Sequence, residues 1–259
     1  MNFVGFYTLF RKEISRFTKV WLQTIGAPVL TALLYQLIFA QAMGKHVEVL
    51  PNVPYNAFLI PGLAMMTMTQ NAFANTSSSL MQSRLTGNLT FLLLAPLSPF
   101  TMFVAYIGAA MVRAVLVGLG VLLATAPFGL PLPEHILLGL AFVLSGSLFM
   151  GSFGLIAGIY SEKFDQLATF QNFLIMPLTF LSGAFLSGAF YSLHSLPAFW
   201  QAISHANPIF YLIDGFRFAF FGVSDVSPYL SLAVTWVFAI GMAAVAYGLL
   251  RSGWKLRNN

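Results

Sequence analysis

The chain has 259 residues, of which 58% are hydrophobic and only 7% are charged, with a net charge of +5. Soluble domains carry about 25% charged residues, so this composition excludes an ordinary soluble enzyme, a disordered chain and a nucleic-acid-binding domain, and it indicates an all-α integral membrane protein. The chain has no cysteine, which excludes disulfides, thiol catalysis and zinc–thiolate sites.

The first predicted element is an amphipathic helix over residues 1–21 that lies in the membrane interface. Its apolar residues recur at three- and four-residue spacing and form one narrow stripe: Phe3, Phe6, Tyr7, Phe10, Ile14, Phe17 and Trp21. Four basic residues lie off this stripe: Arg11, Lys12, Arg16 and Lys19. We expect these cations to face anionic lipid headgroups. The alternative is the first turn of a long tilted span.

Six apolar stretches follow, each long enough to cross a membrane, because about 20 helical residues span the hydrocarbon core. They are residues 22–43, 55–80, 100–126, 135–160, 168–190 and 228–250. The sequence therefore predicts one transmembrane domain over residues 1–259. Its parts are the interfacial helix (1–21), spans one to five (22–190), an external hairpin (191–227), and span six with a cytoplasmic tail (228–259).

The distribution of lysine and arginine predicts the orientation of these spans. Six spans place both termini on one side of the membrane. Nine basic residues fall on that side: Arg11, Lys12, Arg16, Lys19, Arg84, Lys163, Arg251, Lys255 and Arg257. Two fall on the other: Lys45 and Arg217. Because basic residues favour the cytoplasmic side, both termini are expected in the cytoplasm.

Residues 81–98, between the second and third spans, are predicted to form an amphipathic cytoplasmic segment. Leu89, Leu92 and Leu93 recur at i, i+3 and i+4, which gives one apolar face on a short helix. We expect this face to dock into a groove on a soluble partner, with Arg84 steering the segment electrostatically. The alternative is that these leucines lie on the membrane surface.

Arg113 is the one charged residue deep within a predicted span, and no acid lies within any of the six. A charge at that depth is a functional hypothesis by default, and the alternative is a structural arginine bonded to carbonyl groups at a helix break. In the fourth span, Gly154 and Gly158 form a G-x-x-x-G pair that permits close helix contact. We expect this pair to pack within one protomer.

The external segment 191–227 is predicted to be a hairpin of two short re-entrant helices. Leu196, Phe199, Trp200 and Ile203 form an apolar stripe for the first helix. Asn207 is a suitable N-cap for the second, Pro208 suits its first position, and Gly222 can end it. Asp214 and Arg217 are three residues apart, so we expect them to form an ion pair.

A tandem copy precedes this hairpin, because residues 182–186 read SGAFL and residues 187–191 read SGAFY. Five residues are about 1.4 helical turns. The extra copy either bulges out or lengthens the external end of span five, and the sequence leaves both possibilities open.

Three stretches resemble the type-2 ABC exporter permeases. Residues 81–98 match that family's T-G-T-L-E-x-L-L-x-x-P-L-S loop at Thr86, Gly87, Leu89, Leu92, Leu93, Pro96, Leu97 and Ser98, with Thr90 replacing the usual glutamate. Residues 55–63 match its Y-x-x-F-L-x-P-G entry. Leu196, Pro197 and Trp200 match L-P-x-x-W, and N-P-x-x-Y-x-x-D-x-x-R is matched by Asn207, Pro208, Tyr211, Asp214 and Arg217. The resemblance covers the whole chain and is strongest to the small bacterial YadH-like permeases.

The resemblance implies the membrane subunit of an ATP-driven exporter in the bacterial inner membrane. Two copies of the chain would work with two separate ATPase subunits, which bind ATP and Mg²⁺. A lipid, glycan or amphipathic substrate would move by alternating access at the dimer seam, flanked by spans one, two and five.

The motifs that are absent are consistent with this interpretation. The sequence lacks a G-x-x-x-x-G-K-[ST] loop, so no ATP site is expected on this chain, and no cofactor or catalytic residue is predicted. His46, His135, His194 and His205 lack metal-ligand spacing. The alternative function is a secondary transporter without an ATPase, although its usual acidic residues are missing from the spans. An intramembrane enzyme would need a nucleophile–base pair, which no motif offers.

Overall fold

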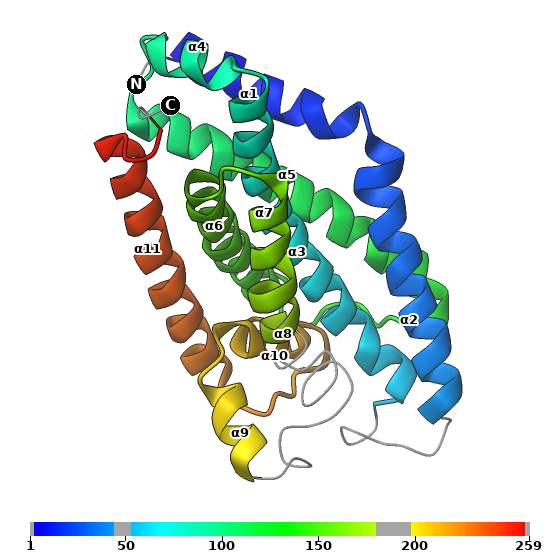
Figure 1. Ribbon diagram of the computed structural model, residues 1–259. Coiled ribbons are helices and arrows are strands. Elements are labelled where there is room, and N and C mark those ends of the chain that lie inside the picture. Colours follow the sequence, from blue (N-terminus) through cyan, green and yellow to red (C-terminus); the bar gives the residue numbers. More distant parts are fainter. Residues whose placement is uncertain (1–2, 44–52, 180–197, 257–259) are drawn as a thin grey trace.

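The computed structural model describes residues 3–43, 53–179 and 198–256, which form an all-α bundle (Figure 1). The α-helices are α1 (Phe3–Thr18), α2 (Ala27–Met43), α3 (Tyr55–Leu85), α4 (Asn88–Leu94), α5 (Pro99–Thr125), α6 (Ile136–Tyr160), α7 (Phe164–Phe170), α8 (Met176–Thr179), α9 (Ala198–His205), α10 (Pro208–Phe221) and α11 (Pro228–Ser252). Two π-helical segments, η1 (Leu22–Gly26) and η4 (Gln171–Ile175), and the 3₁₀ turn η3 (Ala126–Phe128) join some of them.

Four helical stretches in this part of the chain are long and apolar enough to cross a membrane. They are Leu22–Phe39, Pro99–Phe128, Ile136–Tyr160 and Pro228–Ser252, and each coincides with a predicted span. The predicted span 55–80 is helical as part of α3, but it does not reach the same hydropathy. The predicted span 168–190 is helical as far as Thr179 and then leaves the described residues. The number six therefore stays a prediction.

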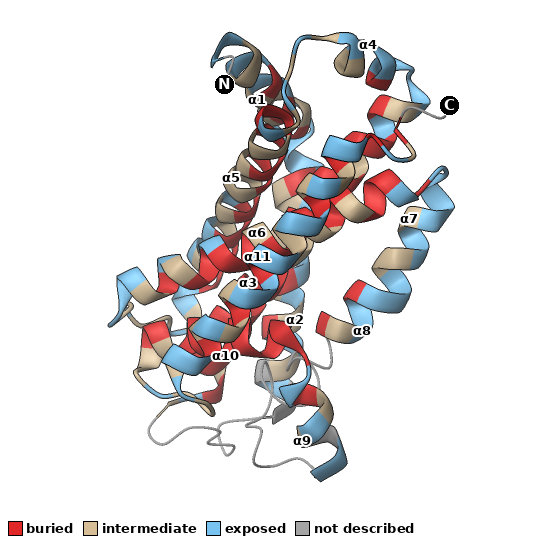
Figure 2. Ribbon diagram, turned by 90° about the vertical axis from the view of Figure 1, so that its left-hand side faces the viewer, coloured by how far each residue is buried: buried red, intermediate tan, exposed pale blue. Residues whose placement is uncertain are grey.

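Helix α3 is the central helix of the bundle, packed most extensively against α6 and α5 (Figure 2). Most of its 31 residues are buried, although many are polar. Its hydroxyl groups donate to carbonyl oxygens one turn earlier, as Thr67 does to Leu63 at 2.9 Å and Ser77 does to Phe73 at 2.8 Å. Because these hydroxyl groups bond within the helix, α3 buries them without leaving them unsatisfied.

Glycines allow α6 to approach α3 closely. A Cβ atom at Gly154 would overlap the Phe73 carbonyl oxygen and the Thr76 hydroxyl group. One turn later, a Cβ at Gly158 would lie 3.1 Å from the Cβ of Leu80. Thr76 also donates to the Gly151 carbonyl oxygen at 2.8 Å across this contact. The prediction that the G-x-x-x-G pair packs within one protomer is confirmed.

The two ends of the chain lie at the same end of the bundle, together with α4, whereas α9 and α10 lie at the opposite end (Figure 1). Helix α1 crosses the bundle at the end that carries the termini and packs mainly against α5. The face that α1 packs on the bundle contains Leu9, Glu13 and Phe17. Of the predicted apolar stripe, Phe3, Tyr7 and Trp21 are exposed, whereas Phe17 is buried.

Helix α10 lies inside the bundle against α6, α11 and α3, and nearly all of its residues are buried. Its ends follow the sequence. The Asn207 side chain accepts a hydrogen bond from the Ile209 backbone N–H at 3.0 Å, Pro208 takes the first position, and Gly222 ends the helix with a φ of 65°. The two predicted short helices are therefore present, with the expected N-cap and end of the second, whereas their re-entrant position on the external side stays a prediction. The tandem copy at 182–191 lies outside the described residues.

Candidate functional site

A groove with a polar lining lies between α2, α3 and the η4–α8 segment. Its lining includes polar side chains from the predicted spans one, two and five: Gln23, Thr31, Tyr35, Thr67, Gln70, Asn71 and Gln171. Apolar residues such as Pro28, Met66 and Met176 complete the lining. The groove can therefore offer amide and hydroxyl groups beside an apolar surface, which suits a ligand with both polar and apolar parts.

Both outer walls of this groove contain a π-helical segment that ends two residues before a proline. Segment η1 precedes Pro28, and segment η4 precedes Pro177. A proline cannot donate to the carbonyl four residues earlier, and its ring collides with that carbonyl. At these two prolines the preceding turn is π-helical, whereas Pro61 lies in the regular α-helix α3. The walls contributed by spans one and five thus share the same local irregularity, and α3 between them remains a continuous helix.

Arg113 on α5 reaches the floor of the groove through Asn71. Its Nε and Nη2 atoms donate to the Asn71 Oδ1 atom at 3.2 and 2.9 Å. The Asn71 amide in turn donates to the Thr67 carbonyl oxygen at 3.0 Å. The partner of Arg113 is therefore the neutral side chain of Asn71, and not a backbone carbonyl group at a helix break. The absence of acids from the predicted spans could not indicate such a partner.

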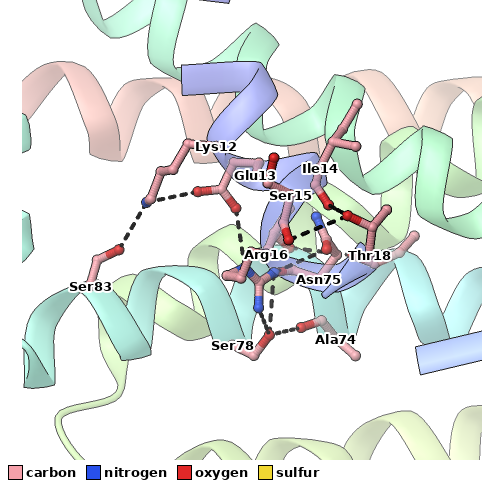
Figure 3. Close-up of polar contacts among 12 residues, drawn as sticks. Lys12, Glu13, Ile14, Ser15, Arg16, Thr18, Ala74, Asn75, Ser78 and Ser83 are labelled. Atoms are coloured by element: carbon pink, nitrogen blue, oxygen red, sulfur yellow. Dashed lines mark hydrogen bonds and ion pairs between the residues drawn. The ribbon is translucent and has the colours of Figure 1, made fainter. Parts of the chain in front are cut away.

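A cluster of charged and polar side chains fastens α1 to α3, and we call it the α1–α3 latch (Figure 3). It consists of Lys12, Glu13 and Arg16 on α1 with Asn75, Ser78 and Ser83 on α3. Glu13 is fully buried, with its Oε1 atom 3.0 Å from the Lys12 Nζ atom and its Oε2 atom 3.5 Å from the Arg16 Nε atom. The carboxylate therefore holds both cations in place for contacts with α3.

The cations of the latch make its contacts to α3. Arg16 donates to the Asn75 backbone oxygen at 2.7 Å, to the Asn75 Oδ1 atom at 3.0 Å and to the Ser78 Oγ atom at 3.1 Å. Lys12 donates to the Ser83 Oγ atom at 3.4 Å. The expectation that Arg16 faces lipid headgroups is wrong, because its guanidinium bonds to α3. The sequence pattern did not lead us to predict a role for Glu13. The signal was present, because this acid has a cation one residue before it and another three residues after it.

The 81–98 segment is a helical turn of α3, a bend at Gly87 and the short helix α4. Gly87 adopts the left-handed conformation, with a φ of 72°, that permits this bend. Leu89 is 6% exposed within the protomer's own core, and Leu92 and Leu93 pack partly against the same core. The face that α4 leaves open instead carries Phe91 and Leu94, which are 74% and 78% exposed.

Arg84 has a structural role at the end of the bundle that carries the termini. Its guanidinium donates to the Ser161 carbonyl oxygen, to the Ile159 oxygen at 3.1 Å and to the Lys255 oxygen at 3.0 Å. Burial lowers the pKa of Arg84 from its ordinary value. The guanidinium thus ties α3 to the end of α6 and to the C-terminal residues. Its expected role in steering the 81–98 segment electrostatically stays a prediction.

The predicted ion pair between Asp214 and Arg217 is not formed. Asp214 accepts hydrogen bonds from the backbone N–H groups of Asp225 at 2.9 Å and Val226 at 3.1 Å. The Arg217 guanidinium instead lies over the Phe58 ring, 3.9 Å from its centroid. The spacing in the sequence predicted that both residues share one helical face. In the structure, the Asp214 carboxylate is bonded to the turn after α10, and the Arg217 guanidinium packs on a ring of α3.

The other predicted hairpin residues join α10 to its neighbours. Asn207 donates from its side chain to the Leu178 carbonyl oxygen at 2.6 Å, and Tyr211 donates to the His205 carbonyl oxygen at 2.9 Å. Trp200 lies on α9, and its side chain is outside the described residues. Over residues 3–43, 53–179 and 198–256, no group of three or more His, Asp or Glu side chains could hold a metal ion.

Comparisons with known proteins point in one direction. The family model of the ABC-2 type transporters matches residues 4–221. The inner membrane transport permease YadH of Escherichia coli is 35% identical over all of this chain and 99% of its own length. Nodulation protein J of Rhizobium leguminosarum bv. viciae is 24% identical over 96% of this chain and 94% of its own length.

Proposed function

This chain belongs to the ABC-2 type transporter family, and from this premise we propose that it is the membrane-spanning subunit of an ATP-driven exporter. It is a permease of a family that lacks the ATPase domain, so ATP hydrolysis is not its own activity. The observation that carries the proposal is the polar groove, whose walls come from the three predicted spans that the family places at its seam.

In this proposal, two copies of the chain form the permease and two ATPase subunits bind ATP and Mg²⁺ on the cytoplasmic side. The transported molecule is a lipid, glycan or amphipathic compound. The groove supports this class because its uncharged amides and hydroxyls lie beside apolar side chains. Access to the groove alternates between the two sides of the membrane as the ATPase pair closes and opens.

The force of ATPase closure enters through α1 and α4 in this proposal. Both helices lie at the end of the bundle that carries the termini (Figure 1). The latch joins α1 to α3 at Asn75 and Ser78, and the buried Asn75 lies one turn from the groove residue Asn71. A displacement of α1 would therefore move the helix that forms the floor of the groove.

Binding of the ATPase tests this proposal. Replacing Phe91 and Leu94 by Ser removes the apolar side chains that α4 leaves exposed, so we expect the ATPase to be lost when the permease is purified in detergent. The matched control replaces Leu132, which is exposed on the turn at the opposite end of the bundle.

We expect the ATPase subunit to co-purify in equal amount with the wild-type chain and with the Leu132→Ser variant. We expect it to be lost from the variant in which Phe91 and Leu94 are replaced by Ser. A wild-type permease that transports without any ATPase would instead identify a secondary transporter.

A further inference from the structure

A basic pocket lies between α1 and the end of α3, beside the latch. Three cations line it, namely Lys12, Arg16 and Lys19. The opposite wall comes from the end of α3 and the start of α4, with the polar side chains of Gln82, Thr86 and Asn88. The pocket thus combines positive charge with groups that donate hydrogen bonds, which is the chemistry that recognises a phosphate group.

The positive charge of this pocket is only partly neutralised by the protein. Glu13 is the acid in contact with its cations, and both of its ion pairs are inside the latch. Three positive charges and one negative charge leave a net charge of +2 around the pocket. The Lys19 ammonium makes no hydrogen bond or ion pair among residues 3–43, 53–179 and 198–256, so it is available to an anion.

An apolar surface continues directly from Lys19. Val20, Trp21 and Leu22 are all exposed, and they adjoin the pocket at the turn between α1 and η1. Tryptophan beside basic residues is typical of the boundary between headgroups and acyl chains. A ligand that joins an anionic head to an apolar tail would therefore cover both the pocket and this surface.

We propose that this pocket binds the phosphate headgroup of an anionic phospholipid from the leaflet that faces the termini. The phosphate contacts Lys19 and the exposed edge of Lys12, and the acyl chains lie along Val20, Trp21 and Leu22. A bound lipid would then bridge α1 to the end of α3 beside the latch. The site is independent of any ATPase, so it can be tested on the permease alone.

Native mass spectrometry of the full chain in detergent measures this binding. The probes are phosphatidylglycerol, phosphatidylcholine with the same acyl chains, and inorganic phosphate. We expect phosphatidylglycerol to bind in preference to phosphatidylcholine, and Lys19→Gln to weaken its binding by about five-fold, the effect of one cation near an anionic lipid. Lys19→Arg should retain binding, because it keeps the charge.

Arg11→Gln is the matched control, because Arg11 is an exposed cation of the same helix that does not line the pocket. It should leave binding within about two-fold. Equal losses in Lys19→Gln and Arg11→Gln would show a diffuse basic surface and overturn the proposal, as would wild-type binding by Lys19→Gln. Inorganic phosphate that binds as tightly as the lipid would also overturn it, because the apolar surface would then contribute nothing.

Discussion

At the scale of single residues, the carboxylate of Glu13 is fully buried and must be stabilised by the groups around it. An ionised carboxylate removed from water needs cations or several hydrogen bonds to offset its lost hydration. Lys12 and Arg16 supply the cations, and Asn75 and Ser78 hold Arg16 in position. Each of these residues therefore depends on the others, and removing one leaves its neighbours unsatisfied.

Glu13→Ala is expected to lower the free energy of unfolding by about 2 kcal/mol, because it leaves two cations without their carboxylate. The loss is smaller than for a fully enclosed pair, since water reaches Lys12 and screens its charge. Equilibrium unfolding in mixed micelles measures the change, and Arg11→Ala serves as the control outside the latch. A Glu13→Ala protein as stable as wild type would show that the latch adds nothing to stability.

Residue types predicted the caps of α10 but not the partners of its charges. Asn207, Pro208 and Gly222 act through the backbone next to them, so their roles follow from local sequence. Asp214 is bonded to the turn after α10, and Arg217 packs on α3. Spacing along one helix cannot predict either contact. The same holds for Arg113, whose partner Asn71 is 42 residues away.

At the scale of helices, the α3–α6 contact shows what the apolar pattern predicts and what it misses. The positions of the membrane helices followed from runs of apolar residues, and α2, α5, α6 and α11 formed where they were expected. The central position of α3 did not follow, because its Ser, Thr and Asn residues resemble a surface helix. Hydroxyl groups such as those of Thr67 and Ser77 donate to carbonyl oxygens of α3 itself, and Thr76 also donates to a carbonyl oxygen of α6, so these side chains can be buried against α6.

Gly154→Ala tests this contact, because the added methyl group would overlap the backbone of α3. We expect the two helices to separate and the protein to lose about 1–3 kcal/mol of stability, as in other overpacked interiors. Gly241→Ala on α11 is the matched control, since no atom lies within 4 Å of its added Cβ. Thermal unfolding in detergent compares the two variants. Equal unfolding temperatures would contradict the close approach.

At the scale of the whole molecule, the arrangement of the helices separates two ends with different chemistry. The end that carries both termini also carries the latch, α4 and the basic pocket (Figure 1). The opposite end carries α9 and the buried helix α10. In the function proposed above, the first end is the one that contacts the ATPase. The proposed function therefore requires that the end with the termini faces the cytoplasm.

Cysteine labelling in intact cells tests this orientation, because the chain has no cysteine of its own. A cysteine at Leu132 should react with a membrane-impermeant thiol reagent, since this exposed residue lies between the predicted spans 100–126 and 135–160, on the side of the membrane opposite the termini. A cysteine at Thr90 on α4 should react only after the cells are opened. Labelling of Thr90→Cys but not of Leu132→Cys in intact cells would reverse the proposed topology.

The latch also sets an order for the synthesis of the protein. Helix α1 leaves the ribosome before α3, and its latch partners Asn75 and Ser83 follow 59 and 71 residues behind the side chains that they bind. Until α3 has been inserted, Lys12 and Arg16, the cations that pair with Glu13, lack their contacts on α3. The newly made α1 therefore waits at the surface of the membrane, and it can take its final place only when α3 arrives beside it.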